Sequence, residues 1–378
     1  MKMGRRIKTT HVGSLPRGPD LSTLLLARDK GEPYDAGVFD QAVDQAVRHA
    51  VARQAEVGVD IVSDGEQSKV SYATYIVDRL TGFGGHAERR FALDLANLPD
   101  LRKKLAAVMG SQEFKRSSCI GPVTLKSLEP CLDDVRRFRR VLDEADATEG
   151  FLNAASPGLV SAFQRNAYYP SHEQYLAALA DAMQPEYEAI ADAGFYLQID
   201  CPDLAMARHT GFQELSEAEF LRRAEQNVDA LNHAVRNIPA ERMRIHICWG
   251  NYEGPHDHDI PLEHILDIVL KAKPSVILFE AANPRHEHEW VVWRDASIPD
   301  EKILVPGVID TCSNYLEHPE LIAQRIERYV AIVGADRVIA GTDCGFGTFA
   351  GYGKIDPQVS WRKLESLRQG ADIAAARL

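Results

Sequence analysis

The sequence lacks the features that mark three common classes of protein. No apolar run approaches the ~18 residues that a membrane-spanning helix needs, and the six cysteines are too few and too scattered for a disulfide framework. Basic residues are outnumbered, because 43 Lys and Arg face 55 Asp and Glu and leave a net charge of −12. This acidic balance gives no electrostatic reason to expect a nucleic acid or an anionic membrane as partner.

The chain also lacks sequence repeats, low-complexity segments and a Pro- or Gly-rich linker. Its 45% hydrophobic and 26% charged residues are close to globular averages, which excludes a disordered or fibrous chain. We therefore expect a single domain over residues 1–378. The basic stretch 1–6 is followed by polar residues 8–11 rather than an apolar segment, which predicts no signal peptide and a cytoplasmic location.

What is present is an alternation of short apolar runs with amphipathic segments. Eight runs are candidate strands, at 7–12, 60–64, 118–123, 196–200, 243–248, 275–280, 303–308 and 338–342. Segments with helical periodicity separate most of them, at 38–57, 172–193, 216–236, 261–272, 317–333 and 357–376. The repetition predicts an α/β fold with a parallel sheet, and eight units favour a (β/α)8 TIM barrel over an open sheet. Long gaps after the second and third runs predict helical insertions at 80–115 and 126–170.

Chemically reactive residues stand where these runs end. They are Asp64-Gly65-Glu66, Asp200-Cys201, His246-Ile247-Cys248, Glu280, Asp310 and Asp343-Cys344. The carboxyl ends of barrel strands converge on one rim, where active sites of this fold are built. We therefore expect these side chains to meet in one site.

His246 and Cys248 are the sharpest pair in this set. Residues at i and i+2 of a strand share a face, so the imidazole and the thiol point the same way. A thiolate and an imidazole together suit zinc, with Cys344 and Glu280 as further candidate ligands. The alternative is a hydrogen-bonded core histidine beside small buried cysteines.

Several motifs carry a family resemblance in their order along the chain. They are Thr9-Thr10-His11-Val12-Gly13-Ser14-Leu15-Pro16-Arg17, Asp64-Gly65-Glu66-Gln67, Ile120-Gly121-Pro122-Val123-Thr124, Gln198-Ile199-Asp200-Cys201-Pro202, His246-Ile247-Cys248, Phe279-Glu280 and Asp343-Cys344-Gly345. Together they resemble the catalytic barrel of cobalamin-independent methionine synthase over nearly the whole chain.

The resemblance implies a (β/α)8 barrel with Zn²⁺ held by four residues, His246, Cys248, Glu280 and Cys344. It also implies that a thiol substrate takes the remaining coordination position. By the same matching, Ser14 and Glu66 would contact an amino-acid thiol, and Asp200 would bind its ammonium group.

The sequence departs from the full enzyme in three places. It holds one barrel, whereas the full methionine synthase has a second, N-terminal barrel. An aromatic residue for the pterin follows the Gly-Pro-Val-Thr motif in the family, whereas Leu125-Lys126-Ser127-Leu128 stand here. Cys312 stands two residues past Asp310, where the family has a catalytic histidine. Single-barrel relatives include methylcobalamin-using core methionine synthases and epoxyalkane:coenzyme M transferase.

Three residues are candidates for a general acid near the rim, namely His11, Asp310 and Cys312. Arg17 is either a contact for a substrate carboxylate or sulfonate, or part of a structural ion pair. We interpret 256–259 as a solvated rim loop, because four polar residues between two prolines make a turn. We interpret 286–289 as surface or at most rim, because its histidines lack the i,i+4 spacing of a zinc pair.

The favoured function is a zinc-dependent transferase that moves a methyl or other alkyl group onto a thiol through a zinc-bound thiolate. Homocysteine is the expected acceptor, and the donor is left open between methyl-folate, methylcobalamin and an epoxide. A second hypothesis is the addition of coenzyme M or another thiol to an epoxide. The others are a non-catalytic zinc- or thiol-binding protein and a metal-free barrel resembling uroporphyrinogen decarboxylases. The oligomeric state is left open, including a homo-oligomer.

Overall fold

Six parallel strands form the centre of the computed structural model, which describes residues 6–85, 87, 90–109, 117–145, 149–351 and 354–378. The strands are adjacent in the order β1-β4-β5-β6-β7-β8. Their bounds are β1 Ile61–Ser63, β4 Glu149–Ala155, β5 Tyr196–Asp200, β6 Met243–Ile247, β7 Val276–Glu280 and β8 Ile303–Gly307. Five of these strands confirm runs that the sequence predicted.

Two further segments join the edge strands of this sheet. The backbone N–H of Ile61 donates to the carbonyl of Thr9 at 3.1 Å, and Thr10 N–H donates to Ala340 O at 2.9 Å. On the other side, Gly341 N–H donates to the carbonyl of Pro306 in β8 at 3.0 Å. The predicted runs 7–12 and 338–342 therefore lie between β1 and β8, where they form single bridges rather than extended strands.

The expectation for the third strand was wrong. Residues Ser118–Cys119 form β3, which pairs antiparallel with β2 (Phe83–Gly84) in a separate two-stranded sheet. The strand that pairs with β1 is β4, which lies inside the segment expected to be the second insertion. An apolar run shows only that a segment is buried and extended, not which sheet it joins. Part of the first expected insertion (86, 88–89 and 110–115) and the N-terminal residues 1–5 lie outside the described residues.

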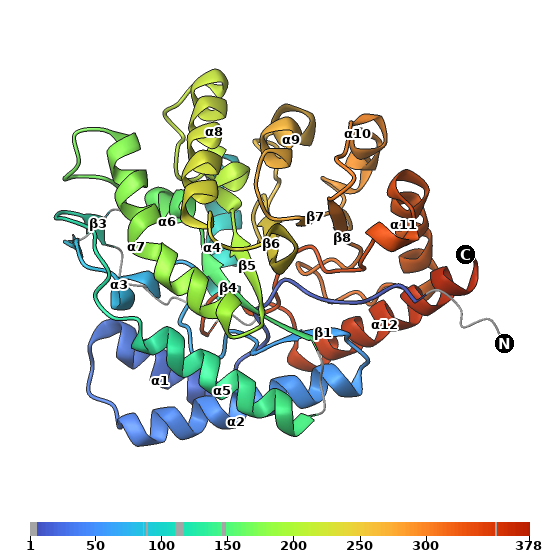
Figure 1. Cartoon of the computed structure of the whole chain (residues 1–378), viewed down its shortest axis with the longest axis horizontal. Coiled ribbons are helices and arrows are strands. Elements are labelled where there is room, and N and C mark those ends of the chain that lie inside the picture. The colour runs from blue at the N-terminus through green and yellow to red at the C-terminus, as the bar shows by residue number, and fades with distance from the viewer. Residues whose placement is uncertain (1–5, 86, 88–89, 110–116, 146–148, 352–353) are drawn as a thin grey trace.

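The helices lie outside the sheet, and Figure 1 shows α8, α9, α10 and α11 following one another around β6, β7 and β8. Six helices confirm predicted segments: α2 Ala36–Glu56, α7 His172–Asp192, α8 Glu217–Ala234, α9 Leu262–Leu270, α11 Pro319–Val333 and α12 Pro357–Ala376. The others are α1 Pro19–Lys30, α3 Ile76–Arg79, α4 Pro99–Met109, α5 Glu129–Ala145, α6 Pro157–Phe163 and α10 Trp290–Asp295. The cap of α8 shows why such boundaries can be read locally, since Ser216 and Glu219 form a reciprocal capping box.

Alternation along the strands sorts side chains between the helical layer and the interior. In β7, the Phe279 ring lies 4.3 Å from Trp293 of α10 and 5.5 Å from Tyr329 of α11. Its neighbour Leu278 packs instead with Val12 and Val305 in a small interior cluster. Glu280, two residues after Leu278, therefore emerges on the interior side of the strand end. Among the described helices, none combines the length and the apolar character needed to cross a membrane.

Candidate active site

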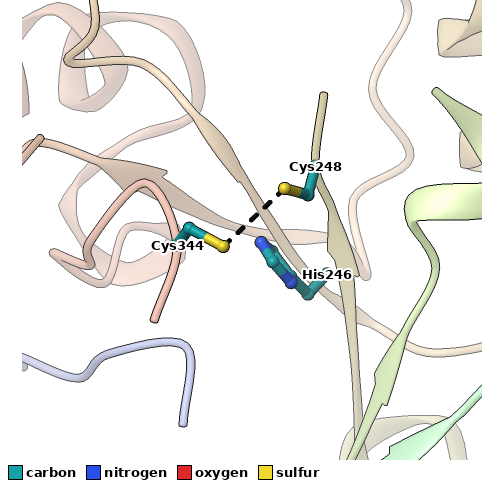
Figure 2. A group of neighbouring side chains, drawn as sticks. All are labelled: His246, Cys248 and Cys344. Carbon is teal, nitrogen blue, oxygen red and sulfur yellow. Dashed lines mark hydrogen bonds between the residues drawn. The ribbon is translucent and has the colours of Figure 1, made fainter. Parts of the chain in front are cut away.

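Three of the predicted metal ligands meet at the carboxyl end of the sheet. His246 lies in β6, Cys248 directly follows that strand, and Cys344 follows the segment 338–342. Their ligand atoms all lie within 4.8 Å of one another, and all three residues are buried. Figure 2 shows the imidazole and the two sulfurs turned toward one another. The predicted shared face of His246 and Cys248 is thus found in the structure.

The donor set of this metal-ligand group, His246, Cys248 and Cys344, fits zinc. The two sulfurs are 3.7 Å apart, and two sulfurs bound at roughly 2.3 Å to one tetrahedral zinc would lie about 3.8 Å apart. The hydrogen bond from the Cys248 thiol lowers the pKa of Cys344, whereas the same contact and burial raise the pKa of Cys248 well above its usual range. Two soft sulfurs and one imidazole are the ligands that zinc prefers.

Glu280 reaches this group but is already hydrogen-bonded. Its Oε1 accepts the backbone N–H of Trp249 at 2.8 Å, and its Oε2 accepts Nδ2 of Asn283 at 2.7 Å. The carboxylate also contacts the thiol of Cys248 and helps to raise its pKa. The structure therefore brings the fourth predicted ligand next to the other three, although it is not one of the mutually adjacent ligand atoms.

Asp200, at the end of β5, holds the ring of His246 in place. Its Oδ1 lies 3.4 Å from Nδ1 of His246, and the carboxylate also accepts Nδ2 of Asn153 at 3.1 Å and Nε2 of Gln198 at 3.1 Å. Burial alone would lower the pKa of His246, but the hydrogen bond to Asp200 and the negative charge on Cys344 raise it to about 8. A carboxylate on one ring nitrogen directs the other nitrogen toward a metal, as in many zinc sites.

A cavity of about 40 Å³ adjoins the metal-ligand group. We call it the deep cavity. Its lining includes the predicted substrate contacts Ser14, Glu66 and Asp200, together with His246, Cys248, Cys344, Tyr72, Met206, Asn251 and Thr348. Glu66 has a positive φ of 54°, and its buried Oε2 has no hydrogen-bond partner in the described part of the chain. Burial and the nearby Asp200 raise the pKa of Glu66 to about 7, against the opposing charge of Lys69.

Two other predicted residues do not reach this cavity. The ring of His11 is fully buried, with Nε2 2.7 Å from Oε1 of Gln54 and Nδ1 accepting the N–H of Gly13 at 3.1 Å. Burial lowers its pKa to about 4, so the ring is neutral near pH 7. Among the described residues, His11 lines none of the cavities at the rim, so the structure gives no support to its expected role as a general acid.

Arg17 connects loops instead of facing a substrate. Its guanidinium donates to the carbonyl of Glu66 at 2.7 Å and to the carbonyl of Gly347. Two roles were considered for Arg17, a substrate contact and an ion pair. Arg17 is not in the described lining of the deep cavity, and the two bonds above go to backbone carbonyls and not to a carboxylate. Its observed contacts join the segments that carry Glu66 and Gly347.

Asp310 and Cys312 line a second cavity of about 320 Å³, which also reaches Glu280 and Cys344. We call it the polar cavity. The carboxylate of Asp310 accepts the N–H of Cys312 at 2.8 Å and the hydroxyl of Ser313. The Cys312 thiol donates to Oδ1 of Asn251 at 3.3 Å, and burial raises its pKa to about 12. The thiol is therefore protonated near neutral pH.

A third cavity of about 280 Å³ opens beside the deep cavity and shares Tyr72, Met206, Asn251 and Thr348 with it. We call it the aromatic cavity, because Tyr72, Phe91, Phe163 and Phe349 line it, with Arg90, Arg102 and Arg165 also in its wall. Sequence reasoning missed this cavity by placing the third strand at 118–123. Phe163 is the last residue of α6, the helix that directly follows β4. A Ser-Pro pair, Ser156-Pro157, stands after the run 151–155 and is typical of a helix start, so it could have revealed this strand and helix and thereby the cavity.

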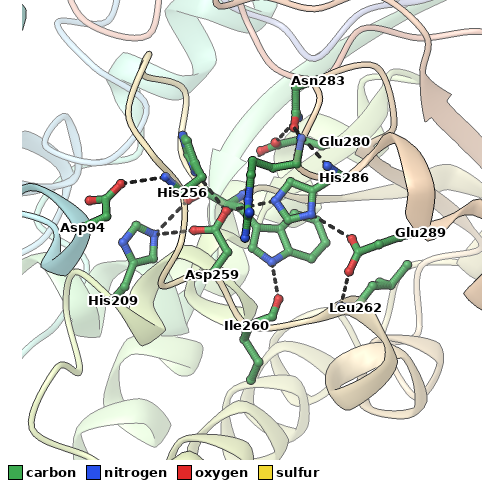
Figure 3. A network of polar contacts seen from close by, with 12 residues as sticks. Asp94, His209, His256, Asp259, Ile260, Leu262, Glu280, Asn283, His286 and Glu289 are labelled. Atoms are coloured by element: carbon green, nitrogen blue, oxygen red, sulfur yellow. Dashed lines mark hydrogen bonds and ion pairs between the residues drawn. The ribbon is translucent and has the colours of Figure 1, made fainter.

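The segments 256–259 and 286–289 fit the sequence-based interpretation only in part, since Asp257, His258 and His288 are exposed. His256, His286 and Glu289 are buried, and the side chain of Asp259 is only 3% exposed. They form one hydrogen-bonded network behind Glu280, shown in Figure 3. The burial of these groups could not be predicted from the sequence, because the network joins three loops that are far apart in the chain; the third loop contributes His209.

Comparison with known proteins agrees with this geometry. The family model described as "Cobalamin-independent synthase, Catalytic domain" matches residues 7–91 and 130–355. Curated relatives include the methionine synthase of Saccharolobus solfataricus, 22% identical over 98% of this chain and 96% of the relative, and that of Thermococcus kodakarensis, 24% identical over 98% and 94%.

Solved structures share the fold. The B12-independent methionine synthase of Shewanella sp. W3-18-1, in complex with selenomethionine, superimposes with a TM-score of 0.69 at 20% identity and 99% coverage of both chains. The putative vitamin-B12-independent methionine synthase of Listeria monocytogenes gives a TM-score of 0.65 at 19% identity, over 98% of this chain and 99% of that one. Since the family model spans well over half of its residues, this chain belongs to the cobalamin-independent synthase family, in the catalytic domain.

Proposed function

We propose that this protein is a zinc-dependent transferase that moves a methyl group from a small donor onto the thiol of homocysteine. The observation that carries the proposal is the deep cavity, a space of about 40 Å³ that is lined both by two carboxylates and by the metal-ligand group. The names of the curated relatives support methionine synthesis. The proposal includes a single (β/α)8 barrel domain in which 7–12 and 338–342 complete the eight strands.

His246, Cys248 and Cys344 would hold the zinc, with Glu280 as the nearest further ligand. Zinc bound there would lower the pKa of a coordinated substrate thiol and fix the position of its sulfur. The protein's own residues do the rest of the binding. Glu66 and Asp200 would pair with the ammonium group of homocysteine, and Ser14 would supply a hydroxyl contact.

The unpartnered Oε2 of Glu66 supports this assignment. A buried carboxylate oxygen without a donor costs free energy, and an arriving ammonium group would remove that cost. Because the pKa of Glu66 is raised to about 7, a bound cation would also favour its ionised form. The deep cavity thereby selects a thiol that carries an ammonium group.

The same lining argues against coenzyme M as the thiol. A sulfonate needs a cationic partner, and the described lining of the deep cavity contains two carboxylates and no Lys or Arg. We therefore prefer homocysteine to the epoxide-addition alternative. The methyl donor would approach from the aromatic cavity, whose shared residues Tyr72, Met206, Asn251 and Thr348 lead directly to the deep cavity.

The residues that would exchange protons with the donor line the polar cavity, which shares Asn251 and Tyr252 with the aromatic cavity from which the donor would approach. The protonated Cys312 thiol, held by Asn251, lines this cavity together with Glu280 and Cys344, and Asp310 fixes the Cys312 backbone. Of the three candidates for the general acid, His11, Asp310 and Cys312, we therefore propose Cys312.

The test uses purified protein loaded with zinc and offered homocysteine with methyl-folate, methylcobalamin or 1,2-epoxypropane in separate reactions. We expect methionine from at least one methyl donor. X-ray absorption should show one additional sulfur at zinc when homocysteine is added. A protein that binds no zinc, or that binds zinc without gaining sulfur from homocysteine, would contradict the proposal.

A further inference from the structure

We infer that the buried cluster of His209, His256, Asp259 and His286 is a positioning unit that holds Trp249 and, through it, Cys248 and Glu280 of the metal site. We call these four residues the Asp259 cluster. The inference rests on the proposed zinc site but concerns residues outside it. Figure 3 shows the cluster packed behind Glu280.

Asp259 is the centre of the cluster. Its Oδ2 lies 2.9 Å from Nδ1 of His256 and 3.0 Å from Nε2 of His286, and its Oδ1 lies 3.3 Å from Nε2 of His209. The three imidazoles come from three separate loops, those before α8, before α9 and before α10. One carboxylate therefore hydrogen-bonds two loops at the rim, and its Oδ1 lies within ion-pair distance of the third.

The outer nitrogens of two rings also face acceptors. Nε2 of His256 lies 2.9 Å from the carbonyl of Tyr252, and Nδ1 of His286 lies 2.8 Å from Oε2 of Glu289. A neutral imidazole has only one N–H, so a ring with acceptors on both sides donates twice only as an imidazolium. Two such cations would balance the charges of the Asp259 and Glu289 carboxylates, and all four of their ring nitrogens are hydrogen-bonded.

Trp249 connects this layer to the metal site at four points. Its backbone N–H donates to Oε1 of Glu280 at 2.8 Å, and its carbonyl accepts Nε2 of His209 at 3.0 Å. Its indole N–H donates to the carbonyl of Ile260 at 2.7 Å. Its ring stacks on the imidazole of His286 with centroids 4.2 Å apart.

Through these contacts the cluster restricts the orientation of two proposed metal ligands, Cys248 and Glu280. Trp249 directly follows Cys248 in the chain, so fixing the Trp249 backbone restricts the direction of the Cys248 side chain. The same residue supplies the N–H that orients the carboxylate of Glu280. Partners that bond a metal ligand directly, as the Trp249 N–H bonds Glu280, typically change metal affinity or activity roughly ten- to a hundredfold when they are replaced. The Asp259 cluster acts through Trp249, so its effect is expected to be smaller.

The neighbouring residues Asp94 and Tyr252 complete the packing. Oδ2 of Asp94 accepts the backbone N–H of His256 at 3.0 Å and the hydroxyl of Tyr252. This contact attaches the loop of His256 to the segment before α4. It leaves the ring nitrogens of His256 for Asp259 and Tyr252.

The test compares Asp259→Asn with a matched control, Asp134→Asn. Asp134 is likewise buried and bonds Arg79 at 2.8 Å, but it belongs to α5, which contributes no residue to the metal-ligand group or the deep cavity. Zinc affinity is measured by chelator competition, and the Co²⁺-substituted proteins are examined by visible absorption. Because Asp259 acts through Trp249, we expect Asp259→Asn to weaken zinc binding by up to about tenfold and to alter the Co²⁺–thiolate bands. The control should leave both unchanged.

A second variant, His286→Phe, separates stacking from hydrogen bonding, since a phenyl ring can still stack on Trp249 but cannot bond Asp259 or Glu289. We expect it to weaken zinc binding by less than Asp259→Asn. Wild-type affinity and spectra in both variants would overturn the inference while leaving the zinc proposal intact. Loss of the fold in both would also overturn it, in favour of a purely structural role, whereas a wild type that binds no zinc would contradict the proposed function itself.

Discussion

Two neighbouring regions of the rim both gather imidazoles and acidic groups, yet they differ in what their polar atoms contact. In the Asp259 cluster, both ring nitrogens of His256 and of His286 have acceptors. In the metal-ligand group and the deep cavity, the two sulfurs contact each other and Nε2 of His246 lies 3.4 Å from a carbonyl. Among the described residues, Oε2 of Glu66 has no hydrogen-bond partner, and in the Asp259 cluster the same holds for Oδ1 of Asp259 and Nδ1 of His209. Buried polar atoms without good internal partners are costly unless a ligand completes them.

The difference separates ligand binding from support of the fold. Among the described residues, only His246, Cys248 and Cys344 bring three candidate ligand atoms close enough for one metal. The Asp259 cluster has more histidines, but the nitrogens of His256 and His286 are directed at carboxylates and a carbonyl, and Nε2 of His209 faces the carbonyl of Trp249. A count of histidines would favour the Asp259 cluster, whereas the hydrogen bonds favour His246, Cys248 and Cys344 as the candidate metal ligands.

The largest expected effect comes from removing a sulfur. Cys248→Ser or Cys344→Ser should reduce bound zinc from about one per chain to near zero, because a hydroxyl is a poor substitute for a thiolate at zinc. The circular dichroism spectrum should be retained, since the interior core does not depend on these residues. Metal analysis is the measurement, with Cys131→Ser, another buried cysteine, as control. Full zinc content in either variant would show that the replaced cysteine is not a zinc ligand.

The next effect concerns pH and the Asp259 cluster. Burial lowers the pKa of His286, but the hydrogen bonds of this residue to Asp259 and Glu289 outweigh burial and raise the pKa to about 10. A raised pKa in the folded state stabilises the protein fully below the unfolded value of about 6.5, and this contribution is lost as pH rises toward 10. The free energy of unfolding should therefore fall over that range, by at most roughly 5 kcal/mol from this group.

Urea unfolding at pH 6, 8 and 10 measures this loss. His286→Gln should flatten the profile, whereas His264→Gln, a replacement of a half-exposed histidine in α9, should keep its slope. Equal slopes in the wild type and His286→Gln would mean that His286 is not a cation in the folded protein.

A smaller effect is expected in the deep cavity. Glu66→Gln should raise KM for homocysteine roughly ten- to a hundredfold, because it removes a charge-assisted contact to the ammonium group worth about 1.5–3 kcal/mol. Steady-state kinetics with 4-mercaptobutanoate, which lacks the ammonium group, provides the control. The variant and wild type should use that thiol equally well. An equal loss with both thiols would show that Glu66 does not read the ammonium group.

The smallest effect lies at the edge of the site. Phe163→Leu should raise KM for the methyl donor about two- to tenfold, the range expected for losing one aromatic contact. KM for homocysteine should stay the same, because Phe163 lines the aromatic cavity and not the deep cavity. A change confined to the homocysteine KM would reverse our assignment of the two cavities.

Much of this architecture was readable in the chain. The periodicity of 172–193 and 357–376 predicted α7 and α12 to within one residue, because an amphipathic helix repeats its pattern locally. The third strand could not be found in the same way. The segment 149–155 contains Gly150 and Asn153, and Asn153 lies in the interior, where its side chain bonds Asp200. A strand with a polar interior position loses the continuous apolar run that the prediction relied on.

The sequence by itself determined that His246 and Cys248 share a face, since the two-residue repeat of a strand is a property of the backbone. Only the tertiary structure decided that Cys344, 96 residues further along, meets Cys248 at 3.7 Å. It also decided that His11 is enclosed by Gln54 and that His286 belongs to a buried network. Local pattern specifies which way a side chain points, whereas closure of the sheet and packing of the loops specify what it meets there.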